Sequence, residues 1–236
     1  MTAEKKQSQA VSRWRRRLAF VLVGVLVALA LFWLRGFRRT GGDTDFAEGI
    51  AMRRFTVFYL RSPLTTYLHQ GAYHFVFAPL GWSSGDAVGF CSAAAGGIFV
   101  ATLLAISSHW LFLLFNLAQP LMFIFLGHVE HYAWVNALLA VYFLSVKRHL
   151  ENGRPLWHAL VWLLLAASFH MLAVFFVPSF LFLLAERDPA TRRWRWRETR
   201  REREDLLMLF IAWAVLLSGL QLTLHVEGLD NGLSRL

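Results

Sequence analysis

Cysteine and charge are both scarce in this chain. Its only cysteine, Cys91, excludes an internal disulfide, and the small apolar residues around it favour a packing role. Charged residues make up 17% of the 236 residues and hydrophobic residues 57%, a balance that soluble domains of this size rarely show. The alternating pattern of a membrane β-barrel is missing, and so are repeats and low-complexity segments. An all-α integral membrane protein is therefore expected, because backbone groups in lipid must pair within their own segment.

Acidic residues are the rarer charged residues, with 15 Asp and Glu against 24 Lys and Arg and a net charge of +9. Such an excess of basic residues is also typical of proteins that bind nucleic acids. The basic residues instead flank the apolar runs, as the positive-inside rule describes for membrane proteins. No nucleic-acid partner is expected, whereas contact with membrane lipids is.

The sequence also lacks the common nucleophile and cofactor motifs. It has no Gly-Xaa-Ser-Xaa-Gly elbow, no P-loop and no dinucleotide-binding fingerprint. His128 and His131 are three residues apart, which is not the i, i+4 spacing of paired zinc ligands on one helix face. No cofactor is expected, apart from a Mg or Mn ion that Asp43 or Asp45 could share with Glu130.

Long apolar runs are abundant, and they predict about seven transmembrane segments. The segments are residues 18–34, 87–106, 110–126, 132–146, two short helices within 156–185, and 206–224. The first is expected to be retained rather than cleaved as a signal peptide, because no small-residue cleavage site follows Leu34. Small residues over 92–97 predict that the second segment packs centrally, and Pro120 is expected to bend the third.

The apolar block 156–185 decides the topology. One helix over these residues would be about 45 Å long, well beyond a hydrocarbon core of about 30 Å. Two short helices that turn near Ser168-Phe169-His170 would place 17 of the 24 Lys and Arg on the inner side, whereas one helix would place 10 there. The positive-inside rule therefore favours the two-helix hairpin.

These segments define the expected organisation. Residues 1–17 form a basic cytoplasmic N-terminus, and residues 18–236 form a single transmembrane domain in a bacterial-type inner membrane. A long outer loop, 35–86, is expected to contain amphipathic helices and to end in a helix-capping turn over 82–86. The inner loop 186–205 alternates Arg with Trp and Glu, which is typical of a basic helix lying on anionic headgroups.

The outer loop combines carboxylates with arginines, and this pattern predicts a reaction site. Asp43, Asp45 and Glu48 lie in the loop, and Glu130 lies on the same predicted side of the membrane. Ionisable groups at span ends are costly unless they pair or work. A partly desolvated carboxylate there could act as a general base on an acceptor hydroxyl, and arginines could hold a phosphate through bidentate hydrogen bonds. The arginines of the loop that suit this role are Arg53, Arg54 and Arg61.

Structural roles compete with these assignments. Asp43 or Asp45 could simply cap the helix expected to begin near Phe46, because an aspartate at that position satisfies unpaired amides. Glu130 has no evident structural role of this kind. The remaining residues with a structural alternative are two headgroup-anchoring arginines and two interfacial histidines, namely Arg53, Arg54, His128 and His131.

Several stretches resemble the membrane-embedded glycosyltransferases of the GT-C superfamily, which include protein mannosyltransferases and aminoarabinose transferases. The first loop opens with Gly42-Asp43-Thr44-Asp45 and continues with Arg61-Ser62-Pro63-Leu64-Thr65-Thr66-Tyr67-Leu68-His69, similar to the Pro-Pro-Leu-Tyr stretch of that family. Gly127-His128-Val129-Glu130-His131-Tyr132-Ala133 is similar to a Gly-Tyr-Val-Glu-Asn-Tyr segment. Residues 163–184, with His170 at their turn, resemble the paired short helices of the family.

The resemblance implies transfer of a sugar from a polyprenyl-phosphate donor to an acceptor at the outer membrane face. By this resemblance Asp43 or Asp45 is the catalytic base or orients the acceptor, and Glu130 is a second acid near the donor. The residues expected to bind substrate are Glu48, Arg53, Arg54, Arg61, His69, His128, His131, Tyr132 and His170.

The chain departs from the family pattern in two ways. Ser62-Pro63 replaces the paired prolines, and the sequence ends after its seventh segment, where family members continue with further spans. It is therefore expected to match the N-terminal half of such an enzyme, as a fragment or a minimal form. The alternative function is a non-catalytic membrane subunit or lipid-binding scaffold. A transporter is less favoured, because the span interiors carry almost no charged residues.

Overall fold

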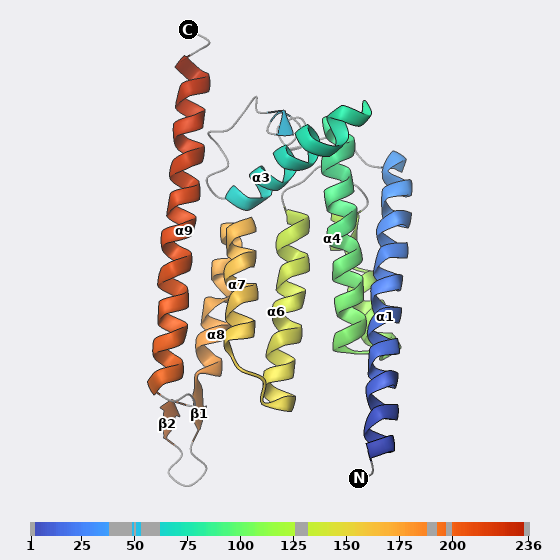
Figure 1. Cartoon of the computed structure of the whole chain (residues 1–236), viewed down its shortest axis with the longest axis vertical. Helices are drawn as coiled ribbons and strands as arrows, with labels where there is room; N and C mark the ends of the chain where they lie inside the picture. Colours follow the sequence, from blue (N-terminus) through green and yellow to red (C-terminus); the bar gives the residue numbers. More distant parts are fainter. Residues whose placement is uncertain are drawn as a thin grey trace.

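The chain folds into an elongated bundle of helices with one short β-hairpin (Figure 1). The computed structural model describes residues 3–37, 49, 51–52, 62–125, 132–187, 193–196 and 200–233. In chain order, with η marking short 3-10 or π segments, the elements are α1 (Ala3–Trp33), η1 (Leu34–Phe37), α3 (Pro63–Ala72), η3 (Tyr73–Phe77), η4 (Ala78–Leu80), α4 (Ser84–Ile106), α5 (Trp110–Leu117), η5 (Pro120–Phe125), α6 (Tyr132–Asn152), α7 (Trp157–Phe169), η6 (Met171–Phe176), α8 (Val177–Leu183), β1 (Ala185–Arg187), β2 (Trp194–Trp196) and α9 (Arg200–Leu233).

Three helices in the described part of the chain are long and apolar enough to cross a membrane. They are Trp14–Trp33 within α1, Ser84–Ile106 (α4) and Glu202–Thr223 within α9, while Trp157–Phe169 and Met171–Leu183 are shorter apolar helices. This agrees with the predicted class, a helical membrane protein. Seven crossings stay a prediction.

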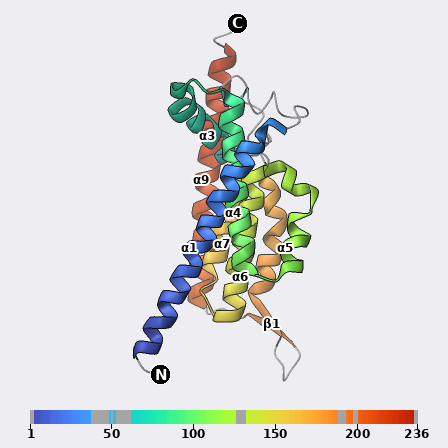
Figure 2. The same ribbon diagram turned by 90° about the vertical axis from the view of Figure 1, so that its right-hand side faces the viewer.

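The helix α4 packs at the centre of the bundle, between α1 and α6 (Figure 2). A Cβ built on Gly24 of α1 would lie 2.8 Å from the carbonyl oxygen of Gly97 in α4, and a Cβ on Gly97 would overlap the carbonyl oxygen of Gly24. Leu31 and Phe125 cover Gly96 just as closely. The predicted central position of this segment is confirmed, because only residues without a side chain permit so close an approach.

Both predicted interruptions of the apolar segments are present. The helix α5 ends at Leu117 and η5 begins at Pro120, so the third segment breaks where proline removes a helical N–H. The helix α7 ends at Phe169, and His170 has an extended backbone with φ -160° and ψ 128°. Its Nδ1 accepts a hydrogen bond from the Leu172 amide at 3.2 Å and so caps the returning segment η6–α8. The hairpin expected within 156–185 is therefore confirmed.

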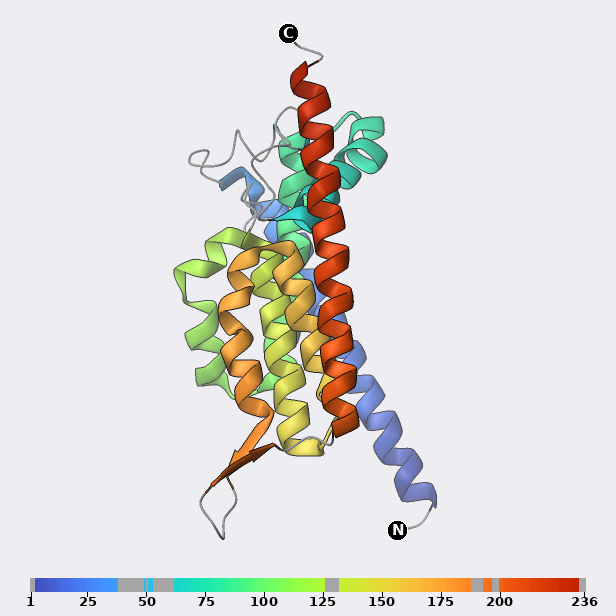
Figure 3. The ribbon, with the colours of Figure 1, turned by 90° about the vertical axis from the view of Figure 1, so that its left-hand side faces the viewer.

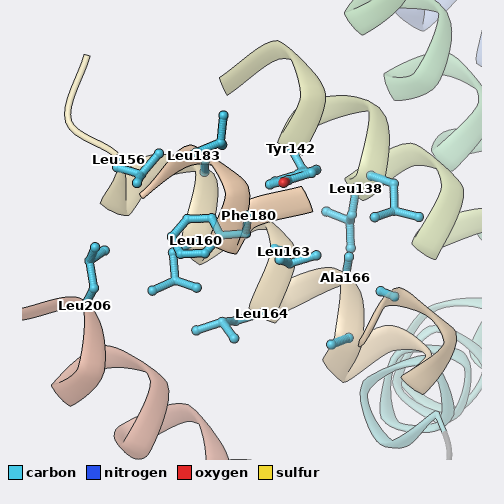
Figure 4. Close-up of a cluster of buried hydrophobic side chains, with 14 of the residues drawn as sticks. Leu138, Tyr142, Leu156, Leu160, Leu163, Leu164, Ala166, Phe180, Leu183 and Leu206 are labelled. Atoms are coloured by element: carbon cyan, nitrogen blue, oxygen red, sulfur yellow. The ribbon is translucent and has the colours of Figure 1, made fainter. Parts of the chain in front are cut away.

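A leucine-rich core joins α6, α7 and α8 (Figure 4). Leu138 and Tyr142 of α6 pack in one buried cluster with Leu163 of α7 and Phe180 of α8. The Tyr142 hydroxyl shares a 2.8 Å hydrogen bond with Ser179 Oγ, which satisfies the polar end of a buried ring. Leu206 extends the same cluster to the start of α9.

The two ends of the bundle differ in charge. The start of α1, the end of α6 and the β1–β2 hairpin lie at one end, which we call the basic end because residues 15–17, Lys147, Arg148 and Arg154 belong to it (Figure 1, Figure 3). The opposite end carries η1, α3 and the turn between α7 and η6, and we call it the α3 end. The described part of the predicted inner loop 186–205 therefore lies on the same side of the molecule as the start of α1.

The expectation of a single basic helix over 186–205 is wrong. Ala185–Arg187 and Trp194–Trp196 pair as antiparallel strands, with Glu186 opposite Arg195, and α9 begins at Arg200. The alternation Trp194-Arg195-Trp196 fits the two-residue period of a strand. The helices α1 and α9 also run further than the predicted spans, to Ala3 and Leu233, because no proline interrupts their hydrogen bonding.

Replacing Gly97 by leucine is expected to destabilise the bundle, because the new side chain meets the backbone of α1 at Gly24. We expect the free energy of unfolding in detergent to fall by about 1–3 kcal/mol, the usual cost of overpacking, seen as a lower Tm by tryptophan fluorescence. Gly219→Leu in α9 is the matched control, since nothing lies within 4 Å of a Cβ there. Equal Tm values for the two variants would contradict the close approach of α1 and α4.

Candidate functional site

Three of the predicted site residues lie in the described part of the chain: His69 in α3, Tyr132 at the start of α6 and His170 after α7. All three belong to elements that meet at the α3 end (Figure 1). The predicted residues that lie outside the described residues are Asp43, Asp45, Glu48, Arg53, Arg54, Arg61, His128, Glu130 and His131.

The helix α3 buries its polar side. Thr65, Thr66, His69 and Gln70 are buried, whereas Phe75 in the following η3 is 81% exposed. Thr66 Oγ1 donates a hydrogen bond to its own helix at the Ser62 carbonyl oxygen, 3.1 Å away. The helix expected in the outer loop is therefore present, with its polar residues buried and with Leu64, Tyr67 and Leu68 half-buried.

The end of α7 anchors α3 and α9. Thr65 Oγ1 donates a 2.6 Å hydrogen bond to the Phe169 carbonyl oxygen, one of the last carbonyls of α7, which lack partners within the helix. At the preceding residue of α7, Ser168 Oγ accepts a 2.7 Å hydrogen bond from Trp213 Nε1 of α9. Two elements far apart in sequence, α3 and α9, are thus fixed to one helix end by two partly buried hydrogen bonds.

Two of the predicted site residues touch one another. The rings of Tyr132 and His170 have centroids 4.8 Å apart, and both side chains are partly exposed. Beside them Trp134 of α6 stacks on Phe169 with ring centroids 5.4 Å apart. These contacts bring the first turn of α6 against the α7–η6 turn.

His69 is fully buried within this end of the molecule. Burial lowers the pKa of its imidazole from 6.5 to about 4, so the ring is neutral at pH 7. Its buried neighbours on α3, Thr65, Thr66 and Gln70, are neutral as well. In this structure His69 packs inside the α3 end as a neutral group, whereas Tyr132 and His170 are partly open to the surroundings.

An ion pair that the sequence analysis missed links η1, which follows α1, to α4 at the same end. Arg35 Nε lies 3.0 Å from Asp86 Oδ1, and the guanidinium carbon lies 4.2 Å from the centre of the Phe32 ring. Ser83 accepts a hydrogen bond from the Asp86 amide at 3.1 Å, which confirms the predicted capping turn. The signal was available, because Arg35 directly follows the first apolar run and Asp86 directly precedes the second.

The described residues give no support for a metal centre. Within the described ranges no group of three His, Cys, Asp or Glu residues is arranged to hold a metal ion. The carboxylates expected to share a Mg or Mn ion, Asp43 or Asp45 with Glu130, lie outside those ranges.

No protein-family model, curated protein or solved structure matches this chain. The GT-C resemblance therefore stays a prediction from the motifs.

The burial of His69 predicts an acid-sensitive fold. Between pH 6.5 and about 4 the unfolded chain binds a proton at this imidazole and the folded chain does not, so stability is present above this window and is lost as the pH falls through it. From about pH 7.5 to about pH 5 this amounts to roughly 2 kcal/mol. We expect the Tm of the wild type in detergent to drop over this range by more than that of His69→Gln.

His109→Gln is the matched control for this experiment, because His109 is exposed at the turn between α4 and α5. It should leave the slope of Tm against pH as in the wild type. A slope that is the same for the wild type and His69→Gln would show that His69 gains its proton without opening the fold.

Proposed function

We propose that this protein is a membrane-embedded glycosyltransferase that moves a sugar from a polyprenyl-phosphate donor to an acceptor at the membrane face beside the α3 end. The observation that supports it best is the meeting, at this end, of α3 from the first loop, the start of α6 and the His170 turn. These are the three regions that carry the motifs resembling GT-C enzymes.

Chain continuity extends this support to the acids. Asp43 and Asp45 follow η1, which ends at Phe37, and Glu130 precedes α6, which begins at Tyr132. The described elements that flank these acids in the sequence, η1 and the start of α6, both lie at the α3 end. Ala51 in the same loop is buried against Val88 near the start of α4, which holds a second point of the loop at this end.

Each residue type has a defined task in this proposal. A carboxylate of Asp43 or Asp45 takes the proton of the acceptor hydroxyl or orients that hydroxyl, and Glu130 acts near the donor. The loop arginines Arg53 and Arg54 hold the donor phosphate, because a guanidinium matches phosphate oxygens in a bidentate manner. The remaining binding residues in this proposal are Glu48, Arg61, His128, His131, Tyr132 and His170, with His69 supporting α3 from inside.

The charge distribution supports an orientation in the membrane. The basic end holds the start of α1 and the hairpin that leads into α9, and cytoplasmic segments of membrane proteins carry such an excess of Lys and Arg. We therefore propose an inner (plasma) membrane protein with a cytoplasmic N-terminus and with the α3 end on the outer face.

A non-catalytic membrane subunit or lipid-binding scaffold is the second candidate, and an apolar groove favours it. A cavity of about 310 Å³ lies between α7, α8 and α9, with Leu163, Phe180 and Phe210 in its walls and Arg203 at the basic end. Such a lining suits an acyl or isoprenoid chain. The tail of a polyprenyl donor would fit the same groove, so activity separates the two candidates.

The catalytic assignment predicts loss of sugar transfer when the acids are neutralised. Purified protein in liposomes, given radiolabelled polyprenyl-phosphate sugars, should transfer label to an acceptor. We expect Glu130→Gln, and whichever of Asp43→Asn and Asp45→Asn removes the base, to lower the rate by about 10²- to 10⁴-fold, the range for loss of general-base catalysis.

Asp205→Asn is the matched control, because Asp205 is an exposed carboxylate near the start of α9 at the opposite end. Its rate should equal that of the wild type. Unchanged transfer in all three acid variants would overturn the residue assignment. Absence of transfer by the wild type, together with a stable complex with a larger transferase, would establish the scaffold function instead.

A further inference from the structure

The basic end contains a cavity that the proposed sugar-transfer site does not use. It has a volume of about 550 Å³ and lies between the start of α1, the turn after α4 and the last turns of α6. Its charged lining consists of Arg16, Arg17, Lys147, Arg148 and Glu151. Ligand sites in proteins have volumes of this order, about 300–1,000 Å³.

The one carboxylate of this cavity is already paired with its lysine. Lys147 Nζ lies 3.7 Å from Glu151 Oε1 and also donates a hydrogen bond to the Ile106 carbonyl oxygen at the end of α4. Among the described side chains no carboxylate forms an ion pair with Arg16, Arg17 or Arg148. Three guanidinium groups around one cavity are therefore left without an acidic partner in the described part of the chain.

The arginines repel one another at this place. Partial burial lowers the pKa of the Arg148 guanidinium from its usual value, and the neighbouring charges of Arg17 and Arg154 lower it further. An anion in the cavity would relieve this repulsion. A guanidinium binds phosphate oxygens through paired hydrogen bonds, and the hydroxyls of Ser107 and Ser108 in the cavity wall add further donors.

The position of the cavity indicates which phosphate it receives. The apolar span within α1 begins at Trp14, so Arg16 and Arg17 lie where that helix enters the hydrocarbon. Phe20 and Leu104 form the apolar part of the cavity wall, and the exposed apolar side chains of α1 continue from there along the bundle. A phosphate with attached acyl chains fits both parts, since the headgroup meets the arginines while the chains lie against α1.

We propose that this cavity binds the phosphate group of an anionic phospholipid in the leaflet at the basic end. Arg16, Arg17 and Arg148 hold the phosphate, and Lys147 with Glu151 stays part of the cavity frame. The lipid joins α1 to the end of α6, which no ion pair in the described residues does. Basic pockets between membrane helices bind anionic headgroups elsewhere by the same chemistry.

Lipid retention by the full-length purified protein tests the proposal. Protein in detergent is titrated with phosphatidylglycerol or phosphatidylcholine, and bound lipid is counted by native mass spectrometry. We expect selective binding of phosphatidylglycerol, weakened roughly fivefold in Arg17→Gln and roughly 25-fold in Arg16→Gln/Arg17→Gln, the range for loss of one and two basic groups at a membrane surface. Arg17→Lys should recover part of the binding.

Arg15→Gln is the matched control, because Arg15 is an exposed arginine on the same helix and lies outside the cavity lining. It should bind phosphatidylglycerol as the wild type does, and the Tm of each variant without lipid shows that the fold is intact. Equal weakening by Arg15→Gln and Arg17→Gln would overturn the proposal in favour of a diffuse surface charge. Displacement of the lipid by millimolar inorganic phosphate or glycerol phosphate would also overturn it, because the ligand would then be a soluble phosphate.

Discussion

The close approach of α1 and α4 at Gly24 and Gly97 sets where the charged residues at both ends of α1 lie. Lipid supplies no hydrophobic force between apolar helices, so their association depends on close van der Waals packing. Because these two backbones are in contact, the position of α1 along α4 is fixed. At one end this brings Arg35 to Asp86, and at the other it brings Arg16 and Arg17 to the turn after α4 and the end of α6.

At the α3 end, hydrogen bonds from other elements reach the C-terminal end of α7. The last carbonyls of α7 have no partner within the helix. Thr65 supplies one donor from α3, and Ser168 connects the same helix end to Trp213 of α9. The polar side of α3 is therefore turned inward, which buries His69 as a neutral ring. The described elements at this end are thereby fixed to one another.

Where one physical rule dominates, the local sequence pattern predicts the observed structure. Charge placement chose the hairpin within 156–185, and the structure has it, with His170 at the turn. Pro120 broke the third segment, and Ser83 capped α4, because both effects act within a few residues. The prediction for 186–205 was wrong, because an alternation of tryptophan, arginine and glutamate is compatible with an interfacial helix and with a short strand pair. Pairing of β1 with β2 decides between the two structures.

The sequence by itself determined the helical membrane class, the positions of the apolar helices and the gathering of basic residues at one end, because burial in lipid and the positive-inside rule act on composition and spacing alone. Only the tertiary structure decided that Tyr132 contacts His170, that Thr65 reaches the end of α7, and that Arg35 pairs with Asp86. It also decided that three arginines of two distant helices surround one cavity. These contacts join residues many positions apart, and their geometry follows from how the helices cross. Small residues such as Gly24 and Gly97 permit a close crossing, but they do not specify which residues meet at the helix ends.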